Sequence, residues 1–196
     1  MFVEVSAAVS RARQRTPSCG RHPQAVCGGV GMKVFSLIGE CAEKSELVRR
    51  LVVELTDRGL RVSTIKRVSD SVDLERSGSG TWKHRQAGAE EVMITNARRF
   101  ALLREMPVDT VEPDVGALLA RMAPVDVVLL DGFRRSSMPK MEVVPAGQGQ
   151  PRYAAQDPKV LALASDRQVP GGTPCLPLSE IHILADFVLA NAVAAG

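Results

Sequence analysis

The sequence predicts an α/β fold, in which a mostly parallel sheet is flanked by helices. Two short and largely apolar runs, residues 34–38 and 125–130, suit strands that are buried on both faces. Strand-like stretches alternate with helical patterns along the chain, which is the order that a parallel sheet requires. With 196 residues, of which 45% are apolar, the chain is long enough for one such domain with its own core.

The first strand, loop and helix lie within residues 33–58. The apolar run at 34–38 ends at Gly39, and a polar loop then leads into a helical pattern. Apolar residues recur on one face of this helix at steps of one, three and four, namely Leu47, Val48, Leu51, Val52 and Leu55. A strand, a tight loop and a helix form the scaffold of a phosphate-binding loop, where backbone N–H groups and the helix N-terminus face an anion.

The loop keeps part of the P-loop motif G-x-x-x-x-G-K-[ST]. Gly39 opens the loop, and Lys44 and Ser45 supply the Lys-Ser pair that contacts phosphate and Mg²⁺ in such proteins. The Gly expected directly before the Lys is replaced by Glu43, and the loop is one residue short. The pattern predicts Gly39, Lys44 and Ser45 as nucleotide-binding residues of a degenerate phosphate-binding loop.

The elements that follow the first helix are a strand, a loop and a helix. Gly59 suits the C-terminal end of the first helix, and residues 61–66 alternate and are rich in β-branched side chains, as strands are. Residues 67–80 are polar and rich in Gly and Ser, which predicts a loop. Residues 81–89 have a helical composition, and Thr81 is the predicted cap.

The middle of the chain predicts two strands and a helix. The strands are expected at 91–95 and 99–104, joined by a turn at 96–98. Asp114 is the predicted cap of the helix that follows, whose apolar side holds Val115, Leu118, Leu119 and Met122.

The C-terminal part predicts two further strands and a last helix. The strands are expected at 140–145 and 159–164, and residues 170–177 are rich in turn-forming residues. Ser179 is the predicted cap of a final helix, whose apolar face holds Ile181, Leu184, Phe187 and Val188.

The apolar run at 125–130 ends in Asp131. In a nucleotide-binding sheet, an acid at such a strand end lies beside the phosphate loop and holds Mg²⁺ directly or through water. An acid that ends a buried strand is also common in proteins without a metal, so the assignment depends on the loop at Gly39. Together the two patterns predict Ser45 and Asp131 as ligands of Mg²⁺.

Basic residues in two other segments are further candidates. Arg134 and Lys140 follow the strand that ends at Asp131 and could contact phosphate, although a solvated basic loop would look the same. His84 and Arg85 lie beside the only Trp in the chain. His84 could contact a ligand or titrate, and the alternative is a solvated surface residue.

The N-terminal 31 residues differ in composition from the rest. They hold four Arg and one Glu and show little periodicity, which predicts a disordered extension before a domain at 32–196. The remaining 165 residues balance 21 basic against 21 acidic residues, which argues against nonspecific nucleic-acid binding. No apolar run approaches the roughly 20 residues of a membrane span. The four cysteines form no CxxC pair, as is typical of reduced thiols in a cytoplasmic protein.

Four segments, taken in order, resemble the MobB family, whose members are P-loop GTP-binding adaptors of molybdopterin-guanine dinucleotide biosynthesis. They are MKVFSLIG, RGLRVSTIKR, TWKHRQAGAEEV and VDVVLLDGFRRSSMPKMEV, and the resemblance runs from about residue 32 to the C-terminus. The W-x-H-R-x-A-G-A core and the D-G-F-R…P-K-x-E-V motif are the segments specific to the family.

The resemblance implies a P-loop NTPase fold with Rossmann-like topology, and a homodimer that binds GTP with Mg²⁺. It also implies association with the molybdenum cofactor guanylyltransferase or with a molybdoenzyme in the cytoplasm, and at most weak GTP hydrolysis. Gly39, Lys44 and Ser45 fall in the family's phosphate loop, and Asp131 takes the place of its metal-side acid. The two specific motifs contain the remaining candidates His84, Arg85, Lys140 and Glu142.

These observations leave two main hypotheses. The first is a GTP-binding accessory protein of molybdenum cofactor biosynthesis. The alternative is a MobB-like scaffold that has lost nucleotide binding and acts as a partner-binding module for cofactor synthesis or insertion. The loss of loop glycines motivates the alternative, because residues with a Cβ resist close approach to phosphate. A metabolite kinase is disfavoured, since the sequence offers no recognisable lid or catalytic base.

Overall fold

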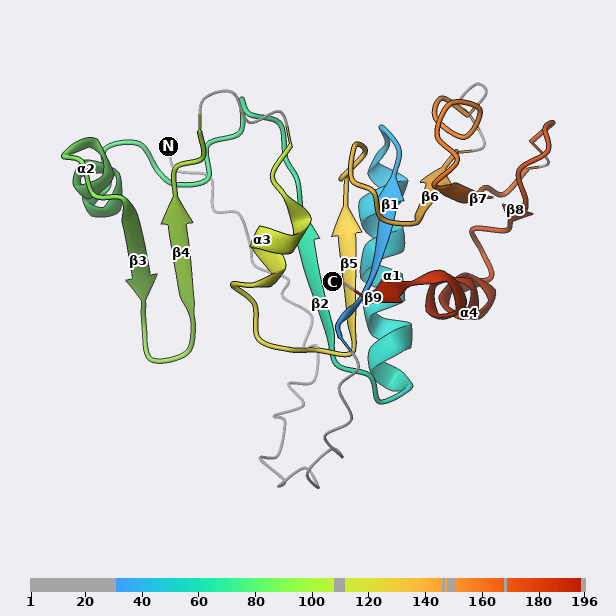
Figure 1. The fold of residues 1–196 in the computed structure, drawn as a ribbon, viewed down its shortest axis with the longest axis horizontal. Coiled ribbons are helices and arrows are strands. Elements are labelled where there is room, and N and C mark those ends of the chain that lie inside the picture. Colours follow the sequence, from blue (N-terminus) through green and yellow to red (C-terminus); the bar gives the residue numbers. More distant parts are fainter. Residues whose placement is uncertain (1–30, 108–111, 146, 148–150, 168, 195–196) are drawn as a thin grey trace, which may run out of the picture.

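A computed structural model describes residues 31–107, 112–145, 147, 151–167 and 169–194, so the predicted N-terminal extension lies almost entirely outside it. Its centre is a seven-stranded sheet (Figure 1). The strands are β1 Lys33–Ile38, β2 Val62–Lys66, β5 Val127–Asp131, β6 Lys140–Val143, β7 Val160–Ala164, β8 Cys175–Leu176 and β9 Val193–Ala194. Their order is β2-β5-β1-β6-β7-β8, and β9 pairs with β1.

The sheet is parallel except for β9, which runs antiparallel to β1. β1 lies in the middle, between β5 and β6, and all residues of β5 and β6 are buried. Strands with helices on both sides need apolar side chains on both faces, which explains why β1 and β5 are largely apolar runs. β6 differs, because it alternates apolar residues with the buried Lys140 and Glu142. The prediction of a mostly parallel α/β sheet flanked by helices is confirmed.

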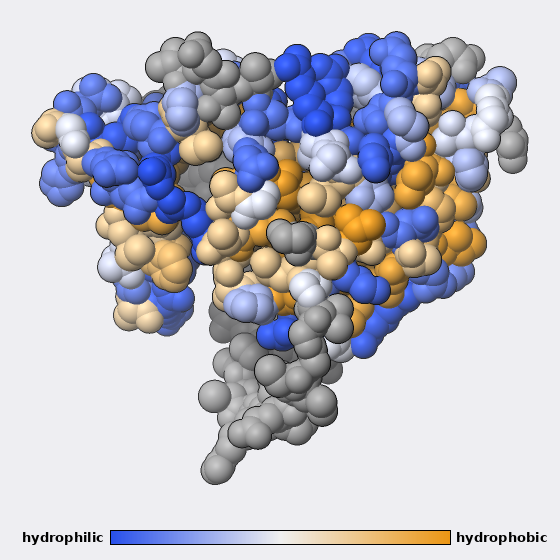
Figure 2. All heavy atoms as spheres, in the orientation of Figure 1, coloured by the Kyte–Doolittle hydropathy of each residue, from blue (hydrophilic) through white to orange (hydrophobic). Residues whose placement is uncertain are grey.

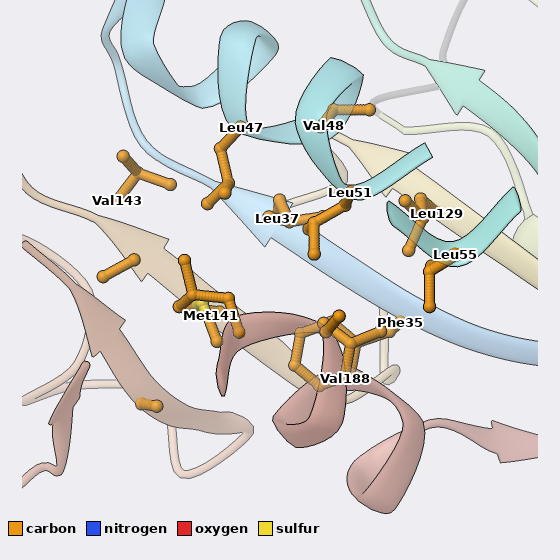
Figure 3. Packing of buried hydrophobic residues seen from close by; sticks show 14 of the residues in the cluster. Phe35, Leu37, Leu47, Val48, Leu51, Leu55, Leu129, Met141, Val143 and Val188 are labelled. Atoms are coloured by element: carbon orange, nitrogen blue, oxygen red, sulfur yellow. The ribbon is translucent and has the colours of Figure 1, made fainter. Parts of the chain in front are cut away.

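Two helices cover one face of this sheet. They are α1 Ala42–Asp57 and α4 Ile181–Asn191. Figure 3 shows Leu37 of β1 close to Leu51 of α1, and Phe35 of β1 close to Val188 of α4. All five predicted core positions of α1 are buried or partly buried in this cluster. The helical periodicity of the sequence therefore identified the correct face of α1.

The opposite face carries the short helix α3, Val115–Leu119. Val115 and Leu119 pack there against Val34 of β1 and Leu130 of β5. Asp114 caps α3 as predicted, because its carboxylate accepts a hydrogen bond from the Ala117 N–H at 2.8 Å. The helix ends earlier than the apolar pattern indicated, so Met122 packs from beyond its C-terminal end.

A separate unit stands beside the sheet in Figure 1. It consists of α2 Gly80–Gln86 and the hairpin of β3 Glu91–Thr95 and β4 Phe100–Arg104. The two strands were predicted, but they form their own two-stranded antiparallel sheet and not part of the central one. Within β3 and β4 only Val92 is buried, so the hairpin lacks the two covered faces that a central strand needs.

Two predicted caps and two short strands differ from the sequence analysis. Ser79, and not Thr81, caps α2 by accepting a hydrogen bond from the Trp82 N–H at 3.2 Å. α4 begins after Glu180 without a side-chain cap, so Ser179 does not cap it. The two-residue strands β8 and β9 were not predicted, because such short strands carry no periodic signal. No helix in the described residues has the length and apolar character needed to cross a membrane.

Candidate functional site

The candidate site lies where the carboxyl ends of β1, β5 and β2 meet. In the sheet register, Asp131 at the end of β5 pairs with Leu37 of β1 and with Lys66 of β2. The carboxyl ends of parallel strands share one edge of the sheet, and ligands of open α/β sheets bind at that edge. The helix that follows β1 therefore begins next to Asp131.

The loop between β1 and α1 is tight, because only residues 39–41 separate the two elements. Gly39 has a φ of +136°, and a Cβ added to it would lie 2.8 Å from the carbonyl oxygen of Val143. This position therefore requires glycine. Cys41 precedes α1 without a side-chain cap, so the first backbone N–H groups of the helix lack a capping side chain.

Lys44 and Ser45 lie in the first turn of α1, and both contact Asp131. The Lys44 ammonium forms an ion pair with Oδ1 of Asp131, and the Ser45 hydroxyl donates to Oδ2 at 3.1 Å. The Asp131 side chain is only 4% exposed. The structure thus brings together Gly39, Lys44, Ser45 and Asp131, the residues that were predicted for the phosphate loop and the metal.

A second lysine completes this cluster. Lys66 donates from its ammonium to Ser45 Oγ at 2.7 Å and to Asp131 Oδ2 at 2.9 Å. From the sequence, Lys66 was predicted to end a strand but not to lie in the site. Its position could have been inferred from the register, because the last residues of adjacent parallel strands lie side by side.

The cluster combines one carboxylate with two ammonium groups. Burial opposes ionisation of Asp131, but hydrogen bonds from Lys44 and then Lys66 outweigh it and hold the pKa of this carboxyl below its ordinary value. The carboxylate is therefore ionised at neutral pH, and the cluster carries a net charge of about +1. Such a site attracts an anion.

A cleft of about 330 Å³ opens at the same edge of the sheet. Gly39 and Gly132 line it together with the basic residues Arg67, Arg134 and Arg135. Gly132 has a φ of +93°, and a Cβ there would lie 3.9 Å from the Lys44 ammonium, so the cleft borders the Asp131 cluster. Arginine is well suited to phosphate groups because its planar guanidinium donates several hydrogen bonds in fixed directions.

Glu40 adds an acidic group to the cleft wall. Its carboxylate accepts a hydrogen bond from the Tyr153 hydroxyl at 2.5 Å and pairs with Arg152. The Tyr153 hydroxyl, followed by Arg152, lowers the pKa of Glu40. The Arg134 guanidinium lies 5.1 Å from the centre of the Tyr153 ring. These contacts partly offset the negative charge that the degenerate loop brings near the cleft.

Lys140 and Glu142 are buried and hold the loops beside the cleft. The Lys140 ammonium donates to the carbonyls of Ser136 and Met138 and lies 3.1 Å from the carboxylate of Asp157. The carboxylate of Glu142 accepts from three consecutive backbone N–H groups, those of residues 152–154. Neither side chain lines the cleft, so both act on the site through the loops they anchor.

His84 and Arg85 lie on α2, in the separate unit, and neither lines the cleft. His84 is exposed. Arg85 donates to Glu75 at 2.5 Å and also pairs with Glu105. These contacts tie α2 to the loop before it and to the end of the hairpin.

The fit of Mg²⁺ can be judged from the oxygen atoms present. Ser45 Oγ and Asp131 Oδ2 are 3.1 Å apart, which suits two neighbouring ligands of an octahedral Mg²⁺, about 3 Å apart. However, the Lys66 ammonium contacts both atoms. The described residues contain no cluster of three or more His, Cys, Asp or Glu side chains that could hold a metal. As arranged, this pair of oxygens does not accept Mg²⁺ unless Lys66 moves.

The fold and the site define the class of protein. A central parallel sheet, a glycine-opened loop after its first strand, a Lys-Ser pair on the next helix and an acid on the adjacent strand together describe an α/β fold of the P-loop NTPase type.

Comparison with known sequences assigns the chain within this class. A family model described as molybdopterin guanine dinucleotide synthesis protein B, MobB, matches residues 34–166. A relative from Escherichia coli K12 is 31% identical over 149 residues, which are 74% of this chain and 85% of the relative. One from Haemophilus influenzae is 29% identical over 145 residues, with 74% and 80% covered. Both are named molybdopterin-guanine dinucleotide biosynthesis adapter protein. The chain belongs to the MobB family.

Solved structures agree with the fold. The crystal structure of a molybdopterin-guanine biosynthesis protein B superposes with a TM-score of 0.61 at 24% identity, over 80% of this chain and 98% of that one. Bacillus subtilis MobB superposes with a TM-score of 0.62 at 15% identity, over 84% and 100%. At these identities the likeness establishes the fold.

Proposed function

We propose that this protein is a GTP-binding accessory protein of molybdopterin-guanine dinucleotide biosynthesis. The observation that carries the proposal is the meeting of Lys44, Ser45 and Asp131 at the carboxyl edge of the sheet, in a chain of the MobB family. The relatives named as adapter proteins support a role as an adaptor. We assign no catalytic residue, and we expect any hydrolysis of GTP to be slow.

The triphosphate would be received at the N-terminal end of α1. Uncapped N–H groups and the helix dipole favour an anion at that end, and Lys44 in the first turn adds a positive charge. Arg134 and Arg135 extend the positive charge along the cleft. Ser45 and Asp131 would be the protein ligands of Mg²⁺ only after Lys66 has moved away from both oxygens.

The proposed homodimer would form through the hairpin of β3 and β4. Met93 and Leu102 pair across the strands, and Phe100 lies on the same face two residues from Leu102. Their exposed fractions are 58%, 37% and 69%. Figure 2 shows apolar atoms along the lower part of this unit. A two-stranded hairpin with an uncovered apolar face is marginally stable alone, which favours pairing with a second copy of the chain.

The proposed partner outside the dimer is the molybdenum cofactor guanylyltransferase or a molybdoenzyme, in the cytoplasm. An adaptor with bound GTP could present this nucleotide, or a conformation that depends on it, to the enzyme. Pull-down with purified guanylyltransferase, with and without GTP, tests this part of the proposal. If the guanylyltransferase is not pulled down either with or without GTP, the result would contradict the proposed association.

Calorimetric titration with GTP tests nucleotide binding. Saturable binding is expected for the wild-type protein, and Lys44→Met should weaken it by about 1.5–3 kcal/mol, the value of a hydrogen bond to a charged group. Lys33→Met is the matched control, because it removes one lysine charge at the first residue of β1, the end of the strand away from the site. An absence of saturable binding at millimolar GTP would reject GTP binding. The alternative hypothesis would then remain, in which the protein is a MobB-like scaffold that binds partners but no nucleotide.

A further inference from the structure

We infer that the Lys66 ammonium is a built-in cation that occupies the Mg²⁺ position, so that this site binds the phosphates of its ligand without a divalent metal. The identity of the ligand as GTP rests on the proposed function. The inference about the cation rests on the contacts of Lys66 alone, and it can therefore be tested separately.

The position of the ammonium supports this inference directly. In a P-loop site the metal's protein ligands are the hydroxyl of the Lys-Ser pair and an acid at the end of a neighbouring strand. Lys66 Nζ lies 2.7 Å from the first of these oxygens, on Ser45, and 2.9 Å from the second, on Asp131. One ammonium thus contacts both atoms that the metal would need.

The backbone fixes the lysine in this place. Lys66 is the last residue of β2 and pairs in register with Asp131, the last residue of β5. The two Cα atoms are therefore neighbours in the parallel sheet, and the lysine stem needs only to lie along the sheet edge. An exposed ion pair between mobile side chains would be weak, but here the carboxylate is 4% exposed and the backbone of Lys66 is held in the sheet.

The charge balance favours an anion over a second cation. Lys44 and Lys66 face one carboxylate, so the cluster is already positive by one charge. Adding Mg²⁺ beside two ammonium groups would raise the local charge to about +3, whereas adding phosphate oxygens lowers it. Mg²⁺ also gives up its water reluctantly, so it competes poorly for two oxygens that already accept hydrogen bonds.

The remaining donor of Lys66 gives the ammonium a way to contact a ligand. An ammonium has three N–H donors, and the contacts with Ser45 and Asp131 use two of them. The Lys66 side chain is 52% exposed, so the third donor can reach a phosphate oxygen at the sheet edge. In a metal-dependent site Mg²⁺ bridges the protein oxygens and the phosphates, and Lys66 would make the same bridge.

The first test compares GTP affinity in EDTA with that in excess Mg²⁺. The wild-type protein is expected to bind GTP equally in both conditions. In EDTA, the Lys66→Met variant should bind GTP at least about tenfold more weakly than the wild-type protein, which is the scale of one charge-assisted contact. Excess Mg²⁺ should restore part of this lost affinity. Lys33→Met is the control that removes a lysine elsewhere in the sheet. The inference would be overturned if the wild-type protein required Mg²⁺ to bind GTP, or if Lys66→Met bound GTP in EDTA as tightly as the wild-type protein. Either result would leave the proposal of GTP binding intact.

The second test needs no nucleotide. Electron paramagnetic resonance titration with Mn²⁺ reports metal binding to the protein directly. The wild-type protein is expected to leave Mn²⁺ free, whereas Lys66→Met and Lys66→Gln, whose folding is checked by thermal unfolding, should each bind it. Equal behaviour of the wild-type protein and both variants would overturn the inference. If GTP fails to bind in every condition, the proposed function fails and this titration still decides the role of Lys66.

Discussion

At the residue scale, the site depends on which partners each charged side chain has. Lys44, Ser45 and Asp131 could be predicted because their residue types follow a strand-loop-helix pattern and an apolar strand. Lys66 was missed because its role comes from the register of two strands that are distant in sequence. Lys140 and Glu142 were named for their motif, and only the structure shows that they bind backbone groups.

Asp131→Asn should remove a part of the stability that depends on pH. The folded pKa of Asp131 lies below its unfolded value of about 3.9, so its ionisation stabilises the fold above that value. This stabilisation is lost as the pH falls through the lower, folded pKa. Urea unfolding should show the variant about 2 kcal/mol less stable at pH 7, and this difference in stability should shrink as the pH falls below the unfolded pKa of about 3.9. A stability difference between the two proteins that does not change with pH would contradict a stabilising role of the ionised Asp131 carboxylate.

Lys140→Met should destabilise the fold by about 3 kcal/mol, measured by urea unfolding. The variant leaves two carbonyl groups and the Asp157 carboxylate without their buried cation. Lys159→Met, at an exposed lysine two residues after Asp157, is the control and should change stability by less than about 0.5 kcal/mol. Equal effects of the two variants would show that the buried contacts contribute little.

At the element scale, the position of the loop between β1 and α1 could be predicted from the sequence, but its shape could not. The sequence showed that it is one residue short, and the structure shows that only residues 39–41 remain between the two elements. The strands and helices with long apolar patterns could be predicted, because burial on one or two faces produces those patterns. The caps of α2 and α4 could not, because Ser79 and Thr81 both suited the start of α2, and α4 begins without a side-chain cap.

Gly39→Ala should cost more stability than Gly59→Ala. Both glycines have positive φ, but only at Gly39 would a Cβ meet another atom, the Val143 carbonyl oxygen at 2.8 Å. The backbone conformation alone costs roughly 1–2 kcal/mol for alanine, and the close contact adds to this cost at Gly39. Thermal unfolding of both variants measures the difference. A loss at Gly39 no larger than that at Gly59 would mean that the loop relaxes freely.

At the scale of the whole molecule, the structure consists of a sheet that carries the site and a hairpin unit beside it. The sequence predicted the hairpin strands correctly but not their separation, because strand patterns do not say which sheet a strand joins. The separation leaves apolar side chains of the hairpin exposed. We therefore place the proposed homodimer contact on the hairpin and the nucleotide on the sheet edge.

Phe100→Glu should convert the dimer into a monomer in sedimentation velocity experiments. The residue is 69% exposed on the apolar face of the hairpin, and a buried, unpaired carboxylate opposes association. Val53→Glu is the matched control, because Val53 is 50% exposed on α1, away from the hairpin. A Phe100→Glu protein that sediments as the wild-type dimer, or a wild-type protein that is monomeric, would contradict the hairpin interface.

In the proposed function, the N-terminal end of α1 receives the phosphates of GTP. A crystal structure of the wild-type protein with GTP, prepared in EDTA, tests it most directly. Phosphate oxygens are expected within hydrogen-bond distance of the Lys44 ammonium and of the first N–H groups of α1, with the Lys66 ammonium still bound to Ser45 and Asp131. Nucleotide bound elsewhere, or electron density that places its phosphates out of reach of Lys44, would contradict phosphate binding at the N-terminal end of α1.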